Sequence, residues 1–252
     1  MHEHITVDVG DGVQTIRFDR PEFGNALTAE MFDLAADAVA LAERNTSVRA
    51  VVVAGMPGMF TAGHDPAELL RFADEAKFGD APIRFMKTFA TIDKPVVAAV
   101  DGLCVGIGTI LLLHCDFVVA SEWSVFSAGC ADIGMPTEGG ASILAPQILG
   151  YHRAFELFVL GEPFDAQRAA QSGLINRVVA PEEVDAVAHG CARALADKPP
   201  EAVRAGRRLL RGDRRDVLNR INQEATSFVD LLRSPAALDA LKLFTERAGG
   251  NA

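Results

Sequence analysis

The chain has 252 residues, 49% of them hydrophobic, and a formal net charge of −10 at pH 7. Its length suits one large domain, or one domain with an appendage, and its acidic balance disfavours non-specific nucleic-acid binding. No apolar run is long enough to span a bilayer, and the first four residues are too polar for a signal peptide, so we expect a cytoplasmic protein. The cysteines show no metal-ligand spacing and are expected to be free thiols: Cys104, Cys115, Cys130 and Cys191.

The first strands and the first helix are marked by clear local signals. Residues 5–9 and 13–18 alternate apolar and polar side chains around Asp11-Gly12, which predicts a β-hairpin. Thr28 has the chemistry of an N-cap, and the amphipathic sequence after it predicts a helix that runs to about Arg44.

The middle of the chain alternates short apolar strands with helices, which predicts the α/β class. Loops at 20–27 and 55–66 are indicated by their Pro, Gly and small residues. The further predicted strands are 50–54, 96–100, 116–120, 124–126 and 176–179. The further predicted helices are one beginning at Pro66 and those at 82–90, 109–114, 139–151, 152–160, 166–171 and 182–196.

Residues 101–108 contain three glycines and join a predicted strand to a short helix. Such a turn points backbone N–H groups and the positive end of the helix dipole at whatever lies in front, which is an anion-binding geometry. A dinucleotide site is disfavoured because Gly106-Ile107-Gly108 is followed by Leu111 instead of a third glycine, and because the helix is too short for a crossover. A tight turn that only packs helix on strand remains open, as does an oxyanion hole completed by a donor from elsewhere.

The tail from Pro199 onward is predicted to be helical, with breaks at Gly212 and at Ser234-Pro235. The tail is rich in arginine, which suits both an oligomer contact and a phosphate-binding rim. A solvated helical face is the third interpretation. Six arginines crowd into twelve residues of this tail: Arg204, Arg207, Arg208, Arg211, Arg214 and Arg215.

A second loop after a strand offers the missing donor, because small residues over 59–65 let a ligand approach the backbone closely. This loop and the glycine-rich turn follow one another at a separation of about forty residues. In both motifs, residues 5–196 resemble the crotonase superfamily, the enoyl-CoA hydratases and isomerases. The resemblance is carried by Arg20-Pro21, Asn25-Ala26-Leu27, Phe60-Thr61-Ala62-Gly63-His64-Asp65, Lys94-Pro95, Asp101-Gly102, Gly106-Ile107-Gly108 and Cys115-Asp116.

The resemblance implies an architecture and a set of partners. It implies an α/β fold of the ClpP/crotonase type, with a spiral of ββα units over residues 1–196. A C-terminal helical region over 197–252 is expected to mediate trimers or dimers of trimers. The expected partner is an acyl-CoA thioester, bound by a homotrimer or hexamer that contacts neither nucleic acid nor membrane. No metal or further cofactor is expected, since CoA belongs to the substrate.

The resemblance also implies an oxyanion hole, in which the backbone N–H groups of His64 and Ile107 hold the thioester oxygen. The family usually has glycine where Ile107 stands, so this wall of the pocket becomes bulkier while the N–H remains. His64 is expected to act through its backbone, with its imidazole facing solvent or substrate. Residues expected near CoA are Asn25, Ala26, Ala62, Gly63, His64 and Asp65.

The catalytic base is sought among carboxylates. Hydratases of this family use two glutamates, and ungapped counting places Ile110 and Cys130 there, which argues against efficient hydration. Glu138 lies in a Thr-Glu-Gly-Gly segment that resembles the one supplying the single glutamate of Δ3,Δ2-enoyl-CoA isomerases. Its alternative interpretation is a glutamate stabilised by a helix dipole. Asp132 is expected to be structural, bonding nearby backbone.

We therefore expect an enoyl-CoA isomerase of fatty-acid metabolism, in which Glu138 removes a C2 proton and returns it at C4. A hydratase, or another crotonase-type reaction such as decarboxylation or thioester hydrolysis, is the first alternative. A Cys130 nucleophile is a less favoured route to hydrolysis, because His114 or His152 would have to fold close to it. The second alternative is an acyl-CoA-binding protein without catalysis.

Overall fold

The strands form two sheets, and the computed structural model describes them within residues 4–75 and 79–249. The larger sheet contains, in spatial order, β1 (Ile5–Gly10), β2 (Val13–Phe18), β3 (Ala50–Ala54), β5 (Val96–Val100), β7 (Phe117–Ser121) and β10 (Arg177–Val179). The smaller sheet contains β4 (Met59–Thr61), β6 (Leu103–Val105), β8 (Val125–Ser127) and β9 (Phe164–Asp165).

From β3 to β8, successive strands alternate between the two sheets along the chain. β3, β5 and β7 pair in parallel in the larger sheet, and the strands that follow them, β4, β6 and β8, pair in parallel in the smaller one. A helix follows each pair of strands, so the chain repeats a ββα unit. This confirms the predicted α/β class and the spiral that the family resemblance implies.

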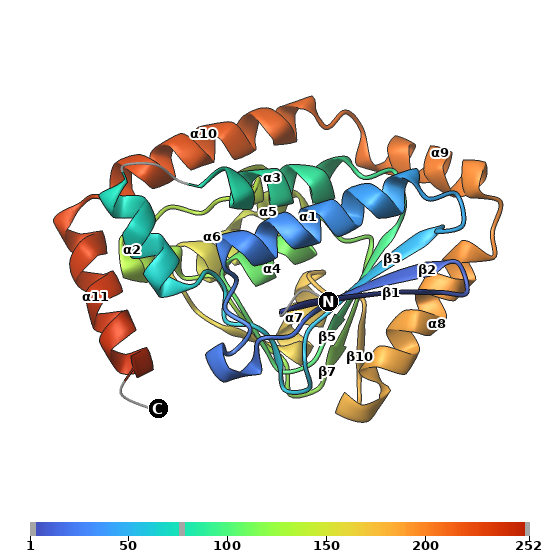
Figure 1. The fold of residues 1–252 in the computed structure, drawn as a ribbon, viewed down its shortest axis with the longest axis horizontal. Coiled ribbons are helices and arrows are strands. Elements are labelled where there is room, and N and C mark those ends of the chain that lie inside the picture. The colour runs from blue at the N-terminus through green and yellow to red at the C-terminus, as the bar shows by residue number, and fades with distance from the viewer. Residues whose placement is uncertain (1–3, 76–78, 250–252) are drawn as a thin grey trace.

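The helices surround the larger sheet, as Figure 1 shows. α3 packs against both α1 and α10 above the sheet, while α8 covers the opposite face against β2, β3, β5 and β7. The helices are α1 (Ala29–Arg44), α2 (Pro66–Asp74), α3 (Asp80–Thr91), α4 (Ile107–Leu112), α5 (Ala141–Leu149), α6 (Tyr151–Phe158), α7 (Ala166–Ser172), α8 (Val184–Ala196), α9 (Pro200–Arg211), α10 (Arg215–Leu232) and α11 (Pro235–Gly249).

The central strands are apolar at every position because both faces of the sheet are covered. In β3, Val51 and Val53 belong to the core cluster that α1 helps to form, and Val52 belongs to the cluster beneath α8. All five residues of β3 and all five of β5 are buried. The sheet is therefore a rigid layer that carries loops at its carboxyl edge.

Local sequence signals set most element ends where they were predicted. Asp11 and Gly12 adopt positive φ angles in the hairpin turn, and the Thr28 side chain accepts a hydrogen bond from the Met31 N–H at 3.3 Å. Three short strands were not predicted: β4 and β6 lie inside segments expected to be a loop and a turn, and β9 lies between two predicted helices. The helix expected from Thr109 instead begins two residues earlier, at Ile107.

The last two helices pack on the spiral core of their own chain. α11 contacts α2 and the 3₁₀ turn Cys130–Ile133, and α10 contacts α2, α3 and α5. A separate apolar cluster joins these elements through Leu69, Phe228 and Leu241. The predicted breaks at Gly212 and Ser234-Pro235 fall between α9, α10 and α11.

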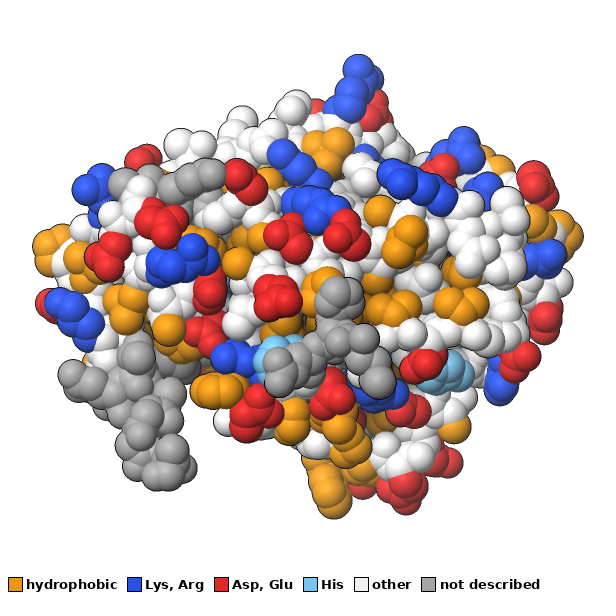
Figure 2. All heavy atoms as spheres, in the orientation of Figure 1, with side chains coloured by type: hydrophobic (Ala, Val, Ile, Leu, Met, Phe, Trp, Pro, Cys, Tyr) orange, Lys and Arg blue, Asp and Glu red, His pale blue; other side chains and the backbone are white. Residues whose placement is uncertain are grey.

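The surface mixes charges of both signs over the face that Figure 2 shows. Arg84 of α3 forms ion pairs with Asp33 and Asp37 of α1. These pairs are exposed, so each adds little to the free energy of unfolding. Among the helices of the described ranges, none combines the length and the apolar character that crossing a membrane requires.

Candidate active site

A cavity of about 410 Å³ opens between the spiral core and the C-terminal helices. Its floor comes from the segments that follow β4 and β6, including His64 and Ile107. Its far wall includes Phe228 of α10 and Leu241 of α11. The lining is mostly apolar and carries a few polar groups, which is typical of small-molecule sites.

Two glycine-containing segments meet at the floor because β4 and β6 are parallel neighbours, with Thr61 beside Cys104. Gly63 has a φ of +94°, and a Cβ there would lie 3.2 Å from the Val105 carbonyl oxygen. A residue with a side chain would therefore be strained at Gly63, and glycine lets the two segments touch. This contact sets His64 and Ile107 at the same end of the small sheet.

The start of α4 is fixed by close packing beneath it. A Cβ at Gly108 would lie 2.3 Å from Thr61 Cγ2, so glycine is required for α4 to sit on β4. Thr109 Oγ1 donates hydrogen bonds shared between the carbonyls of Cys104 and Ser127, at 2.8 and 3.0 Å. Ile107 is the first residue of α4, and such a position has no acceptor within its own helix for the N–H.

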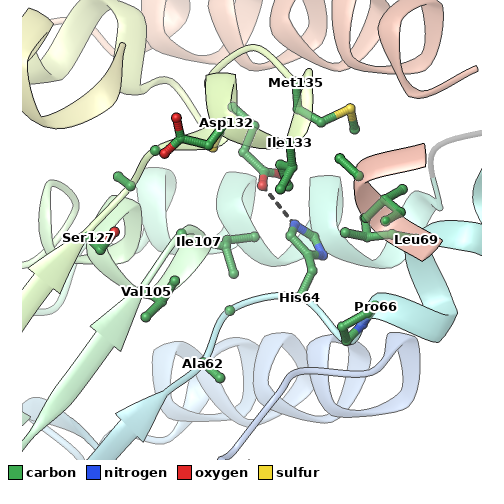
Figure 3. Close-up of a pocket in the computed structure, with 18 of the residues that line it drawn as sticks. Ala62, His64, Pro66, Leu69, Val105, Ile107, Ser127, Asp132, Ile133 and Met135 are labelled. Carbon is green, nitrogen blue, oxygen red and sulfur yellow. Dashed lines mark hydrogen bonds and ion pairs between the residues drawn. The ribbon is translucent and has the colours of Figure 1, made fainter. Parts of the chain in front are cut away.

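The side chains of His64 and Glu138 meet at the cavity, and the dashed line that ends on the labelled His64 in Figure 3 marks their hydrogen bond. His64 Nε2 lies 2.7 Å from Glu138 Oε1, and the two side chains are 7% and 5% exposed. The sequence-based expectation that the imidazole faces solvent or substrate is therefore incomplete. It lines the cavity, but it is buried and bonded to the carboxylate expected to be the base.

The turn that carries Glu138 is held from two sides. His114 Nε2–H donates to the Gly139 carbonyl at 2.7 Å. Glu224 of α10 accepts from the backbone N–H groups of Gly140 and Ser142, the latter at 2.9 Å. Burial lowers the pKa of His114 to about 3 and raises the pKa of Glu224. A neutral imidazole and a buried carboxyl group thus clamp the backbone next to Glu138.

The residues expected near CoA divide into two groups. Asn25 is fully buried, and its side-chain amide donates to backbone carbonyls, including that of Met59 at 3.0 Å. Asp65 caps α2 and pairs with Arg20 at 2.7 Å. Ala26 is also buried, so these three hold the loop that carries Gly63. The cavity itself is lined by Ala62, Gly63 and His64.

The positions of the hydratase glutamates lie close to the site but carry no carboxylate. Ile110 is fully buried within α4, and Cys130 lines the cavity. Burial raises the pKa of the Cys130 thiol to about 12, so thiolate is scarce near neutral pH. Asp132 also lines the cavity, but it is exposed, and Figure 3 shows it turned to one side of the His64–Glu138 pair.

Sequence reasoning missed the contribution of the C-terminal helices to the site. The apolar periodicity of the tail predicted helices with a buried face, but it gave no sign of what that face would contact. Phe228 and Leu241 lie on that face. Within the described ranges, no group of three or more His, Cys, Asp or Glu side chains is placed to hold a metal ion.

Comparisons with known proteins show which family the chain belongs to. Residues 8–249 match the enoyl-CoA hydratase/isomerase family. A 4-chlorobenzoyl coenzyme A dehalogenase of an Arthrobacter species is 33% identical over 78% of this chain and 73% of its own length. Human enoyl-CoA delta isomerase 2 is 29% identical over 88% of this chain, which spans 58% of that relative.

A solved structure shows the same fold. The crystal structure of an enoyl-CoA hydratase/isomerase from Pseudoalteromonas atlantica superposes with a TM-score of 0.90 at 29% identity. The match covers 97% of this chain and 98% of the other. The likeness therefore includes the C-terminal helices as well as the spiral core.

Proposed function

This chain belongs to the enoyl-CoA hydratase/isomerase family of the crotonase superfamily, and from that premise we propose that it is a Δ3,Δ2-enoyl-CoA isomerase. The observation that carries the proposal is Glu138, a buried carboxylate at the cavity beside the two segments that present His64 and Ile107. A relative described as an enoyl-CoA delta isomerase supports it. The dehalogenase among the relatives means that family membership alone leaves the reaction open.

In the proposed reaction the thioester oxygen of a 3-enoyl-CoA lies against the backbone N–H groups of His64 and Ile107. Glu138 takes a proton from C2, the electron pair moves toward the thioester, and the oxygen gains negative charge. Backbone donors aimed at that oxygen lower the barrier most, because the charge develops in the transition state. The protonated Glu138 then returns the proton at C4, which leaves the double bond between C2 and C3.

One carboxylate suffices for this proton shuttle, whereas hydration needs a second one to position and activate water. Ile110 and Cys130 provide no such group. The second candidate function is nevertheless hydration, because Asp132 lines the same cavity as Glu138. Thioester hydrolysis by Cys130 is disfavoured by the raised pKa of its thiol.

Substrate assays separate these candidates. We expect 3-hexenoyl-CoA to be converted to 2-hexenoyl-CoA, with little 3-hydroxyacyl-CoA formed from 2-hexenoyl-CoA. The Asp132→Asn variant should isomerise like the wild type. Rapid hydration by the wild type that Asp132→Asn abolishes would favour the hydratase. Binding of both thioesters without turnover would identify an acyl-CoA-binding protein.

We also propose that the chain assembles as a homotrimer or hexamer in the cytoplasm. Large apolar side chains on two helices face outward in the single chain: Tyr151 is 66% exposed on α6, and Leu209 and Leu210 are 84% and 90% exposed on α9. Exposed apolar side chains of this size are typical of surfaces that contact another protein. Sedimentation analysis tests the assembly, and a monomer would contradict it.

A further inference from the structure

We propose that the His64 imidazole positions the catalytic carboxylate, so that one residue serves both the oxyanion and the base. This inference rests on the proposed function, and it assigns the side chain of His64 a role beyond that of its backbone N–H. The two roles can be separated experimentally, because every substitution except proline keeps the backbone donor.

The hydrogen-bond geometry defines what the imidazole does. A base must be ionised, and an ionised carboxylate only accepts hydrogen bonds, so His64 Nε2 carries the hydrogen and donates it to Glu138 Oε1. Oε2 is then the oxygen available to the substrate proton. The same N–H···O bond persists after Oε2 is protonated, because Oε1 still accepts, and the carboxyl group keeps its orientation through both proton transfers.

The imidazole is itself held in place by aromatic contacts. Its ring centroid lies 5.1 Å from that of Phe32 on α1 and 6.2 Å from that of Phe228 on α10. These rings come from helices far apart in the sequence, and both lie close to the imidazole. A buried histidine with a purely structural role can bond any acceptor. The partner of His64 is instead a carboxylate that lines the cavity.

The expected effect follows from the charge on Glu138. A carboxylate this buried is poorly solvated, and a single donor to a charged group contributes enough to change a rate by about 10- to 100-fold. Loss of the donor leaves Glu138 free to rotate and less ready to act as a base. The effect should appear in kcat, whereas binding of acyl-CoA should change little.

The sharpest test compares two amides of nearly equal polarity. In His64→Gln the side-chain nitrogen reaches the position of Nε2, whereas in His64→Asn it is too short to reach Glu138. We expect kcat for 3-hexenoyl-CoA to fall by about 10- to 100-fold in His64→Asn and to recover most of that loss in His64→Gln. The dissociation constant of saturated hexanoyl-CoA, measured by calorimetry, should stay near the wild-type value in both.

A double-mutant cycle shows whether His64 acts through Glu138. In the Glu138→Gln background, His64→Asn should cause no further loss of kcat, because the carboxylate it positions is gone. His152→Asn, on the exposed side of α6, is the matched control and should leave kcat unchanged.

The outcomes distinguish the inference from the proposed function. Near-wild-type kcat in His64→Asn, or equal losses in the Asn and Gln variants, would overturn the inference while Glu138 remains the base. An unchanged kcat in Glu138→Gln would instead overturn the proposed function itself. Folding of each variant is checked by its thermal unfolding midpoint, and the Gln variant supplies the rescue that a purely structural role cannot explain.

Discussion

Two buried polar clusters in this molecule are built from similar groups but face different surroundings. At the cavity, His64 and Glu138 form one pair whose carboxylate has open space beside it. Beneath α9, Asp116 pairs with Arg207 at 2.7 Å and with Arg211 at 3.3 Å. Asp116 also accepts a hydrogen bond from the Val96 N–H at 2.8 Å.

The surroundings of the second cluster explain its role. Arg207 and Arg211 also donate to the carbonyls of Ile92 and His114, so the guanidinium groups fasten α9 to the ends of α3 and α4. The Asp116 carboxylate is engaged by three donors, whereas Glu138 is bonded through one oxygen, although both carboxylates border a cavity. A charged group beside a cavity is therefore not catalytic for that reason alone; the two carboxylates differ in how many donors already occupy their oxygens.

The largest effect is expected from a change in the His64–Glu138 pair at the cavity. Glu138→Gln keeps the shape of the side chain but removes the base, so kcat for 3-hexenoyl-CoA should fall about a hundredfold to ten-thousandfold. The free energy of unfolding should change little, because the amide still bonds to His64. Deuterium uptake at C2 in heavy water should disappear together with turnover. A variant that still isomerises near the wild-type rate would place the base elsewhere.

The second prediction concerns the ion pairs of Asp116 beneath α9. Asp116→Asn leaves two buried guanidinium groups without their carboxylate, which should lower the free energy of unfolding by about 3 kcal/mol. Urea unfolding of the variant measures this loss. The kcat of the folded fraction should match the wild type, and Arg208→Gln, at an exposed pair with Asp93, serves as a control with a small effect.

His114 connects the two clusters, because its imidazole bonds next to Glu138 and its carbonyl accepts from Arg211. Its pKa is about 3 in the folded protein, below the value of about 6.5 in the unfolded chain. Between these two pKa values His114 is protonated in the unfolded chain but neutral in the folded protein, so the free energy of unfolding falls as the pH is lowered. His114 should therefore make the free energy of unfolding about 2 kcal/mol smaller at pH 5 than at pH 7.

His114→Gln sharpens this prediction, since an amide donates to Gly139 but does not titrate. The wild type should lose more stability than the variant when urea unfolding is repeated at pH 5. Parallel losses in the two proteins would mean that other groups account for the acid sensitivity.

The smallest effect is expected where α10 contacts the turn that carries Glu138. Glu224→Gln replaces one acceptor oxygen by a donor that faces a backbone N–H, so stability should fall by about 1 to 2 kcal/mol. The turn carrying Glu138 should shift slightly and lower kcat by about tenfold. Arg220→Gln, a neighbour on α10 that bonds the Ser142 hydroxyl, is the control and should leave kcat unchanged. Equal kcat in Glu224→Gln and wild type would show that α10 does not position the base.

Most of the fold could be predicted from sequence because its long elements carry their own signals. The hairpin turn at Asp11-Gly12 and the N-cap at Thr28 are local, and the structure has both. The strands β4 and β6 were missed because three residues among glycines show no periodicity; their pairing depends on neighbours far along the chain.

In the candidate site, too, motifs could be recognised from the sequence, whereas contacts between distant residues could not. Glu138 and the His64 and Ile107 positions were found through motifs, and their roles remain predictions. The bond between His64 and Glu138 joins residues 74 positions apart, so no local pattern could indicate it. The contact of Glu224 with Gly140 spans 84 positions and was missed for the same reason.

The capping of Gly140 and Ser142 by Glu224 also has a consequence for the order in which the protein acquires activity during its synthesis. The glutamate-bearing turn leaves the ribosome first, whereas Glu224, whose carboxyl group steadies this turn, follows 84 positions after Gly140. Phe228, whose ring lies close to that of His64, emerges later still. A nascent chain interrupted after α8 (Val184–Ala196) thus possesses the proposed oxyanion segments and the proposed base, but lacks the contacts that Glu224 and Phe228 make with them. Catalytic competence should therefore be a late event in translation, even where the spiral folds early.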